Sequence, residues 1–206
     1  AADASAPAPR LGLALLARAT HDAAGARAWL DSAARVAAGD PRWRAAVARE
    51  GSTAALLRGD YTEAVLLARR ALADTAALPA DERAWTRFQD LVARRRRGER
   101  VTTAMLDSID GITPRTDTLL LARLACVRIG REPARVTALA DSGVALALAV
   151  GDPQSAATCR MQLGAWLTDR GDPPAAVRAF RAADSLFAQA RDLAGRAAAN
   201  QRLGYV

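Results

Sequence analysis

The chain has 206 residues, of which 51% are hydrophobic but only 4% aromatic, and its formal net charge of +7 rests on arginine alone, because there is no lysine. This composition favours thin, closely packed layers of Ala- and Leu-rich helices over a large aromatic core. No apolar run in the sequence approaches the ~18 residues of a membrane-spanning helix.

The N-terminal segment 1–9 is rich in alanine and proline, so we expect it to be extended or to serve as a linker. Small residues of this kind also surround the sites that signal peptidase cleaves. The segment could therefore be a processed start or a linker within a longer chain. We favour an exported or periplasmic location over a cytoplasmic one.

Glycine, aspartate and proline then interrupt the chain at regular places, most clearly as Gly-Asp-Pro at 39–41, 151–153 and 171–173. Glycine ends a helix, aspartate caps the next one, and proline fits its first turn. The alternation typical of strands is absent, which predicts an all-α fold of about eleven helices. We place them at 8–19, 22–38, 41–58, 61–76, 80–97, 100–109, 115–129, 132–150, 153–170, 173–190 and 193–206.

An internal repeat links the last part of the chain to itself at a spacing of 40 residues. A second pattern places small or apolar residues 5, 9 and 12 positions after Gly59 and again after Gly171. Repeats of this length indicate stacked helical hairpins. The residues that match are Asp152 and Asp192, Ala157 and Ala197, Leu163 and Leu203, Gly164 and Gly204, then Ala64, Ala68 and Ala71 with Ala176, Phe180 and Ala183.

With Leu163-Gly164 on one helix and Gly171, Ala176 and Phe180 on the next, the chain resembles the tetratricopeptide repeat family. The family's tryptophan near the repeat start is missing. The resemblance implies an α-solenoid of antiparallel helix-turn-helix repeats, forming a single domain over 10–206. Within that domain, residues 80–150 match the pattern poorly, and we expect degenerate repeats there.

Few residues could support catalysis or hold a cofactor. His21 is the only histidine, and its place at a turn favours a structural role. Cys126 and Cys159 are not in a CxxC pair, so we expect small packing residues; a disulfide between them stays open. Phosphate-binding and nucleophile motifs are absent. We expect no enzymatic activity, no metal and no cofactor.

Three groups of side chains are candidates for binding a partner. Tryptophan and arginine at the start of one predicted helix match the composition of interface hot spots. The run of four arginines could contact an anionic surface, although positive charge also stabilises a solvated helix C-terminus. In the repeat family, the first helices of the hairpins line the binding face, which adds residues by resemblance. The candidates are Arg42, Trp43 and Arg44; Arg94, Arg95, Arg96 and Arg97; and Arg49, Thr53, Met161, Thr168 and Gln201.

The sequence favours a protein–protein interaction scaffold whose partner is another protein or protein complex. One alternative is an accessory subunit that clamps a large assembly, membrane-associated on the periplasmic side. Another is a regulatory repeat segment of a longer bacterial signalling protein. Nucleic acid is not expected as a partner, because aromatic residues do not alternate with the arginines and no recognised motif is present.

Overall fold

The computed structural model describes residues 6–20, 22–73 and 76–206, and within them the chain is all-α. It divides into two compact units, Ala1–Val101 and Thr102–Val206. The sequence predicted one repeat domain over 10–206, and the helices of that stretch are grouped into these two units.

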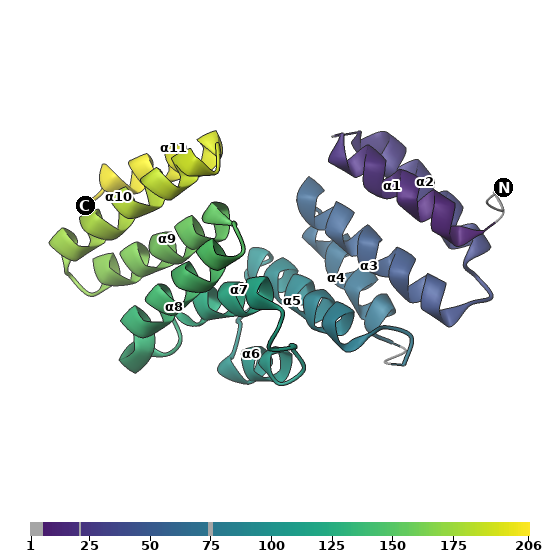
Figure 1. Ribbon diagram of the computed structural model, residues 1–206, viewed down its shortest axis with the longest axis horizontal. Coiled ribbons are helices and arrows are strands. Elements are labelled where there is room, and N and C mark those ends of the chain that lie inside the picture. Colours follow the sequence, from purple (N-terminus) through teal and green to yellow (C-terminus); the bar gives the residue numbers. More distant parts are fainter. Residues whose placement is uncertain (1–5, 21, 74–75) are drawn as a thin grey trace. The chain divides into compact units, whose positions relative to one another are not determined.

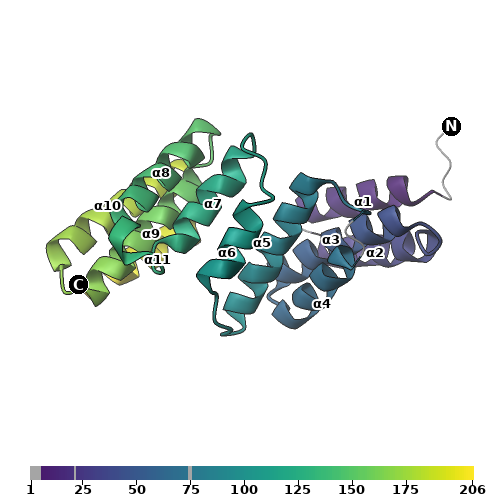
Figure 2. The same ribbon diagram turned by 90° about the horizontal axis from the view of Figure 1, so that it is seen from below.

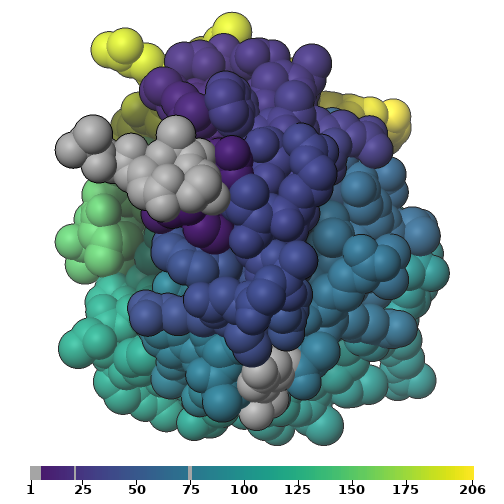
Figure 3. Space-filling view, turned by 90° about the vertical axis from the view of Figure 1, so that its right-hand side faces the viewer, coloured from purple at the N-terminus to yellow at the C-terminus, as the bar shows by residue number. Residues whose placement is uncertain are grey.

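In its described residues, the first unit holds five helices, which form two hairpins and a single helix. α1 packs against α2 and α3 against α4, and α5 lies on α4 (Figure 1). In the space-filling view the colours pass from purple through indigo to blue, following the order of the hairpins (Figure 3). The helices are α1 (Pro7–Ala19), α2 (Ala23–Val36), α3 (Pro41–Arg58), α4 (Tyr61–Leu72) and α5 (Ala80–Arg96).

The second unit repeats this arrangement. Its antiparallel hairpins are α7 with α8 and α9 with α10; α11 packs on α10, and α6 contacts α7 (Figure 2). The elements are α6 (Thr103–Asp110), α7 (Thr118–Arg128), the 3-10 helix η1 (Pro133–Arg135), α8 (Val136–Ala149), α9 (Pro153–Asp169), α10 (Pro173–Gln189) and α11 (Leu193–Leu203).

The Gly-Asp-Pro turns at 151–153 and 171–173 behave as predicted, whereas before Asp40 the helix already ends at Val36 and Gly39 is not left-handed. Gly171 ends a helix at φ 73°, a left-handed conformation that glycine adopts without strain. The Asp172 carboxylate then accepts the backbone N–H of Ala175 at 3.0 Å and caps α10. Before α11 the same turn is made by Arg191 at φ 54°. These local rules explain why the eleven α-helices found among the described residues occur close to the predicted places.

For α6 and α7, a cap explains why the helix begins later than predicted. α6 begins at Thr103 rather than 100, because the Thr102 hydroxyl accepts the backbone N–H of Met105. α7 begins at Thr118 rather than 115, because Asp117 caps it in the same way. At the N-terminus, α1 already begins at Pro7, since proline fits the first turn of a helix, so residues 7–9 are not extended. Helix α4 ends at Leu72, short of the predicted 76.

Small side chains make the packing tight. Ala64 is fully buried, and its carbonyl oxygen accepts a hydrogen bond from the buried Ser52 hydroxyl at 2.9 Å across the α3–α4 interface. In the second unit, a Cβ added to Gly164 would lie 2.5 Å from Phe180. Helices this close need alanine, glycine or serine at the crossing, which is the packing that the Ala-rich composition predicted.

In each unit, the first helix of one hairpin is linked to the next helix that runs in the same direction. In the first unit, Arg49 of α3 pairs with Glu82 of α5 at 2.7 Å, and Gln89 donates to Thr53 at 2.9 Å further along both helices. These helices therefore run parallel, as in a solenoid-like stack of hairpins.

A disulfide makes the corresponding link in the second unit. It joins Cys126 of α7 to Cys159 of α9, with their Cα atoms 4.6 Å apart. Both cysteines are buried in an apolar cluster with Ile129 and Leu163, as expected for packing residues. The bond between them, which the sequence left open, ties together the first helices of two successive hairpins.

Candidate functional site

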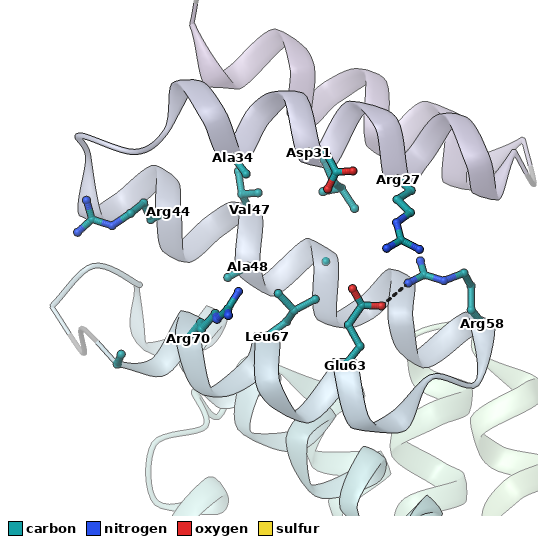
Figure 4. A pocket seen from close by; sticks show the side chains of 13 residues that line it. Arg27, Asp31, Ala34, Arg44, Val47, Ala48, Arg58, Glu63, Leu67 and Arg70 are labelled. Carbon is teal, nitrogen blue, oxygen red and sulfur yellow. Dashed lines mark hydrogen bonds and ion pairs between the residues drawn. The ribbon is translucent and has the colours of Figure 1, made fainter.

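A cavity opens within the first unit, where α2 and α4 face each other across α3. Its volume is about 550 Å³, and its lining comes from these three helices. Each helix contributes one face: on α2, Arg27, Leu30, Asp31 and Ala34 follow helical spacing. The cavity is thus built from three faces of one unit (Figure 4).

Small residues explain why space remains there. Ala34 of α2 and Ala48 of α3 line the cavity with short side chains. Next to them, Gly51 holds α3 close to α4, since a Cβ at Gly51 would lie 3.1 Å from Leu67 Cδ1. α3 therefore packs tightly on α4, while the space between α2 and α4 on the other side of these residues stays open. Leu30, Val47 and Leu67 give this space an apolar lining.

Six charged residues surround the apolar part. Arg58 is paired with Glu63 at 2.7 Å, and Arg44 donates to the carbonyl oxygen of Ala38 at 2.6 Å. Within the described part of the chain, Arg27, Asp31 and Arg70 form no ion pair. Four arginines against two carboxylates leave the lining with an excess of positive charge. The charged residues are Arg27, Asp31, Arg44, Arg58, Glu63 and Arg70.

Of the residues predicted at the start of α3, only Arg44 lines this cavity. Arg42 is exposed, and its backbone N–H is bound to the Asp40 cap at 2.8 Å. Trp43 is partly buried against the cluster of Leu11, Ala33, Ala37 and Val47. Trp43 therefore has a packing role between the first two hairpins.

Arg49 and Thr53 lie together, as the resemblance implied, but their polar groups are engaged within the unit. Arg49 pairs with Glu50 at 2.9 Å and with Glu82 at 2.7 Å, and Glu50 also pairs with Arg18 at 2.9 Å. Thr53 donates to the Arg49 carbonyl oxygen. This network joins α1, α3 and α5.

The arginine run straddles the end of α5. Arg94 pairs with Asp90 at 2.8 Å and Arg97 with Glu99 at 3.4 Å, while Arg96 is exposed. The guanidinium groups of Arg94 and Arg97 are thus partly neutralised by acidic neighbours on the same stretch of chain. The run thus lies at the exposed end of α5, where positive charge is favourable beside the helix C-terminus.

The remaining predicted residues lie in the second unit. Met161 of α9 is partly buried against Ala157 and Phe187. The Thr168 hydroxyl donates to the Gly164 carbonyl oxygen at 2.9 Å, and Gln201 of α11 is exposed. Among these three, Met161 contributes to packing, Thr168 is exposed but its hydroxyl binds its own helix, and Gln201 is exposed.

Sequence reasoning missed Arg27, Asp31 and Arg70. The spacing of the first two showed that they share a helix face, but each is a single charge without a motif. The resemblance pointed to the first helices of the hairpins, whereas this cavity lies between two second helices. These side chains come together only because α2 and α4 face each other across α3.

Within the described residues, no cluster of three or more His, Cys, Asp or Glu side chains is arranged to hold a metal ion. His21 lies outside the described residues. None of the helices described combines the length and apolar character needed to cross a bilayer.

Comparison of the chain with protein-family models and with curated proteins gives no match.

Proposed function

We propose that this chain is a protein-binding scaffold built from tetratricopeptide-like hairpins, without enzymatic activity, and that the cavity between α2 and α4 is where it holds another polypeptide. The observation that supports this most is the cavity itself, which combines an apolar lining with charges that form no ion pair within the part of the chain that the structure describes. Its volume of about 550 Å³ falls within the usual size of binding pockets.

The stacked hairpins support the same function. A solenoid-like stack exposes faces of several helices along its length, and such faces commonly receive extended or helical segments of other proteins. A repeat fold provides a platform rather than a reaction centre, so the binding role is argued from the cavity and not from the fold alone.

Site-directed photo-crosslinking tests the proposal on the full chain. A benzophenone amino acid replaces exposed Ala34, which lines the cavity, or exposed Ala145 of α8 as the control position. We expect a defined protein adduct in a source-cell extract from position 34 and none from position 145. After its identification by mass spectrometry, the partner is purified and its affinity is measured by calorimetry.

A substitution that fills the cavity provides a second test of the proposed function. Ala34→Trp places a bulky side chain among Leu30, Val47 and Leu67, and we expect it to weaken binding of the purified partner at least about tenfold. Ala145→Trp should leave affinity unchanged. A partner that binds Ala34→Trp as tightly as the unaltered chain, or a cavity position that yields no protein adduct, would refute the proposed function.

A second candidate function is that of an accessory subunit in an assembly outside the cytoplasm. The Cys126–Cys159 disulfide favours it, because disulfides persist mainly in oxidising compartments. Trapping free thiols during cell lysis tests this location. Recovery of the chain with both cysteines labelled would argue for a reducing compartment.

A further inference from the structure

We propose that the cavity between α2 and α4 is specific for an acidic segment of the partner protein, one that inserts an apolar side chain between carboxylates. This inference rests on the proposed function and specifies the chemistry of the occupant. It places binding on the side of the second helices, away from the Arg49–Glu50 network of the first helices.

Two cations face each other at one end of the cavity. Arg27 extends from α2 toward Arg58 across the open space, and Arg58 is held there by Glu63 (Figure 4). Like charges that face each other are stabilised by an anion placed between them. Glu63 compensates for only one of the two, so this end of the cavity favours a carboxylate from the ligand.

A further cation stands apart from this pair. Arg70 extends from α4 near Ala48, and within the described residues it has no ion-pair partner (Figure 4). A guanidinium group donates several hydrogen bonds in a planar fork that matches a carboxylate. Arg27 and Arg70 therefore offer two separate binding points for acidic side chains.

The lining between these points is apolar. Leu30 of α2, Val47 of α3 and Leu67 of α4 converge there, and Ala34 and Ala48 leave room beside them. An apolar side chain inserted here would remove these surfaces from water, which stabilises the complex by the hydrophobic effect. The ligand thus needs an apolar anchor flanked by negative charge.

The two carboxylates of the lining disfavour nucleic acid and free phosphate as ligands. Asp31 is exposed at the cavity, and it has no cation partner among the described residues. A continuous polyanion would be repelled by Asp31, whereas a polypeptide brings N–H donors for it as well as acidic side chains for the arginines. Charge complementarity therefore selects an acidic peptide.

Selection from a random peptide library on phage tests the specificity without knowledge of the partner. The full chain is the bait, and enriched peptides are synthesised and titrated by fluorescence polarisation. The variant Arg27→Gln/Arg70→Gln removes the two cavity cations that have no ion-pair partner among the described residues. The matched control Arg35→Gln/Arg69→Gln removes the same charge from exposed positions on the same two helices, outside the cavity lining.

We expect enriched peptides that combine Asp or Glu with Leu, Ile or Phe. Loss of the two guanidinium donors should weaken their binding about tenfold or more, while the control variant should change it less than about twofold. Affinity should fall at high salt, and neither inorganic phosphate nor a single-stranded oligonucleotide should displace the peptide.

Several results would overturn the inference: no enrichment, enrichment of basic or uncharged peptides, equal loss in both variants, or displacement by phosphate or oligonucleotide. The proposed function is tested separately by the purified partner. A partner that binds the unaltered chain, binds Ala34→Trp more weakly and binds Arg27→Gln/Arg70→Gln as tightly as the unaltered chain would support the scaffold function and contradict the acidic specificity.

Discussion

Gly164 of α9 and Phe180 of α10 are in such close contact that a Cβ on Gly164 would lie 2.5 Å from Phe180 Cε1. Phe180 is fully buried. The ring therefore occupies the space that any other residue at position 164 would need, and the interface between these two helices depends on the absence of a side chain there.

We expect Gly164→Leu to lower the free energy of unfolding by about 1–3 kcal/mol through overpacking. The measurement is thermal or urea denaturation followed by circular dichroism. Gly12→Ala is the matched control, because Gly12 also lies inside a helix but has open space around it. That change should raise stability by about 0.5–1 kcal/mol. Equal effects at the two positions would contradict the close α9–α10 contact.

Reduction of the Cys126–Cys159 disulfide should destabilise the second unit. The bond closes a loop between residues 33 positions apart. Loss of this constraint on the unfolded chain corresponds to about 3–4 kcal/mol in the chain-entropy description. Urea unfolding with and without a reductant measures it. The variant Cys126→Ala/Cys159→Ala should unfold at a lower urea concentration than the unaltered chain, and reductant should not change its midpoint. An unchanged midpoint for the unaltered chain after reduction would argue against the bond.

Acid should weaken the second unit through two helix caps. Burial raises the pKa of Asp152, but hydrogen bonds from Ser155 and the nearby Arg123 outweigh it and leave the pKa below its ordinary value of 3.8. For Asp192, the backbone N–H of Gly195 lowers the pKa from the same ordinary value of 3.8.

A lowered pKa in the folded state means that the unfolded chain binds protons more readily. The stabilisation is therefore present above the ordinary carboxyl pKa and is lost as pH falls through the lowered, folded-state value. Asp152→Asn/Asp192→Asn keeps capping side chains but removes the titration. We expect the unfolding midpoint of the unaltered chain to fall more steeply in acid than that of this variant; parallel curves would rule the caps out as the cause.

Arg128 should hold α6 against α7. Its guanidinium donates to Glu132 at 2.6 Å and to Asp107 of α6 at 2.7 Å, and its side chain is only 11% exposed. We expect Arg128→Met to lower the protection of α6 amides by about 1–3 kcal/mol. Hydrogen exchange followed by mass spectrometry measures this. Arg115→Met, at a side chain 75% exposed, should have little effect on α6. Unchanged α6 protection in Arg128→Met would show that apolar contacts alone hold the helix.

The helices could be predicted from sequence because their limits are set locally. A glycine such as Gly171 ends one helix and an aspartate such as Asp172 begins the next, whatever lies around them in space. Thr102 and Asp117 were overlooked as caps, which displaced the predicted starts of α6 and α7.

The cavity could not be predicted in this way. Its charged residues Arg27 and Arg70 belong to different hairpins, and nothing in either helix tells how far α2 stands from α4. Helical spacing showed which residues share a face, but the distance between faces depends on packing in three dimensions. The disulfide was left open for the same reason, since two cysteines in different helices pair only if the stack brings them together.

The Cys126–Cys159 bond spans α8 and the turns on both sides of it. A protease that cut the chain in the turn at Gly151 would break the backbone without releasing a fragment, because the pieces on either side would still be joined through sulfur. Such a nicked molecule would migrate as one chain on a denaturing gel and separate into two only after a reductant was added.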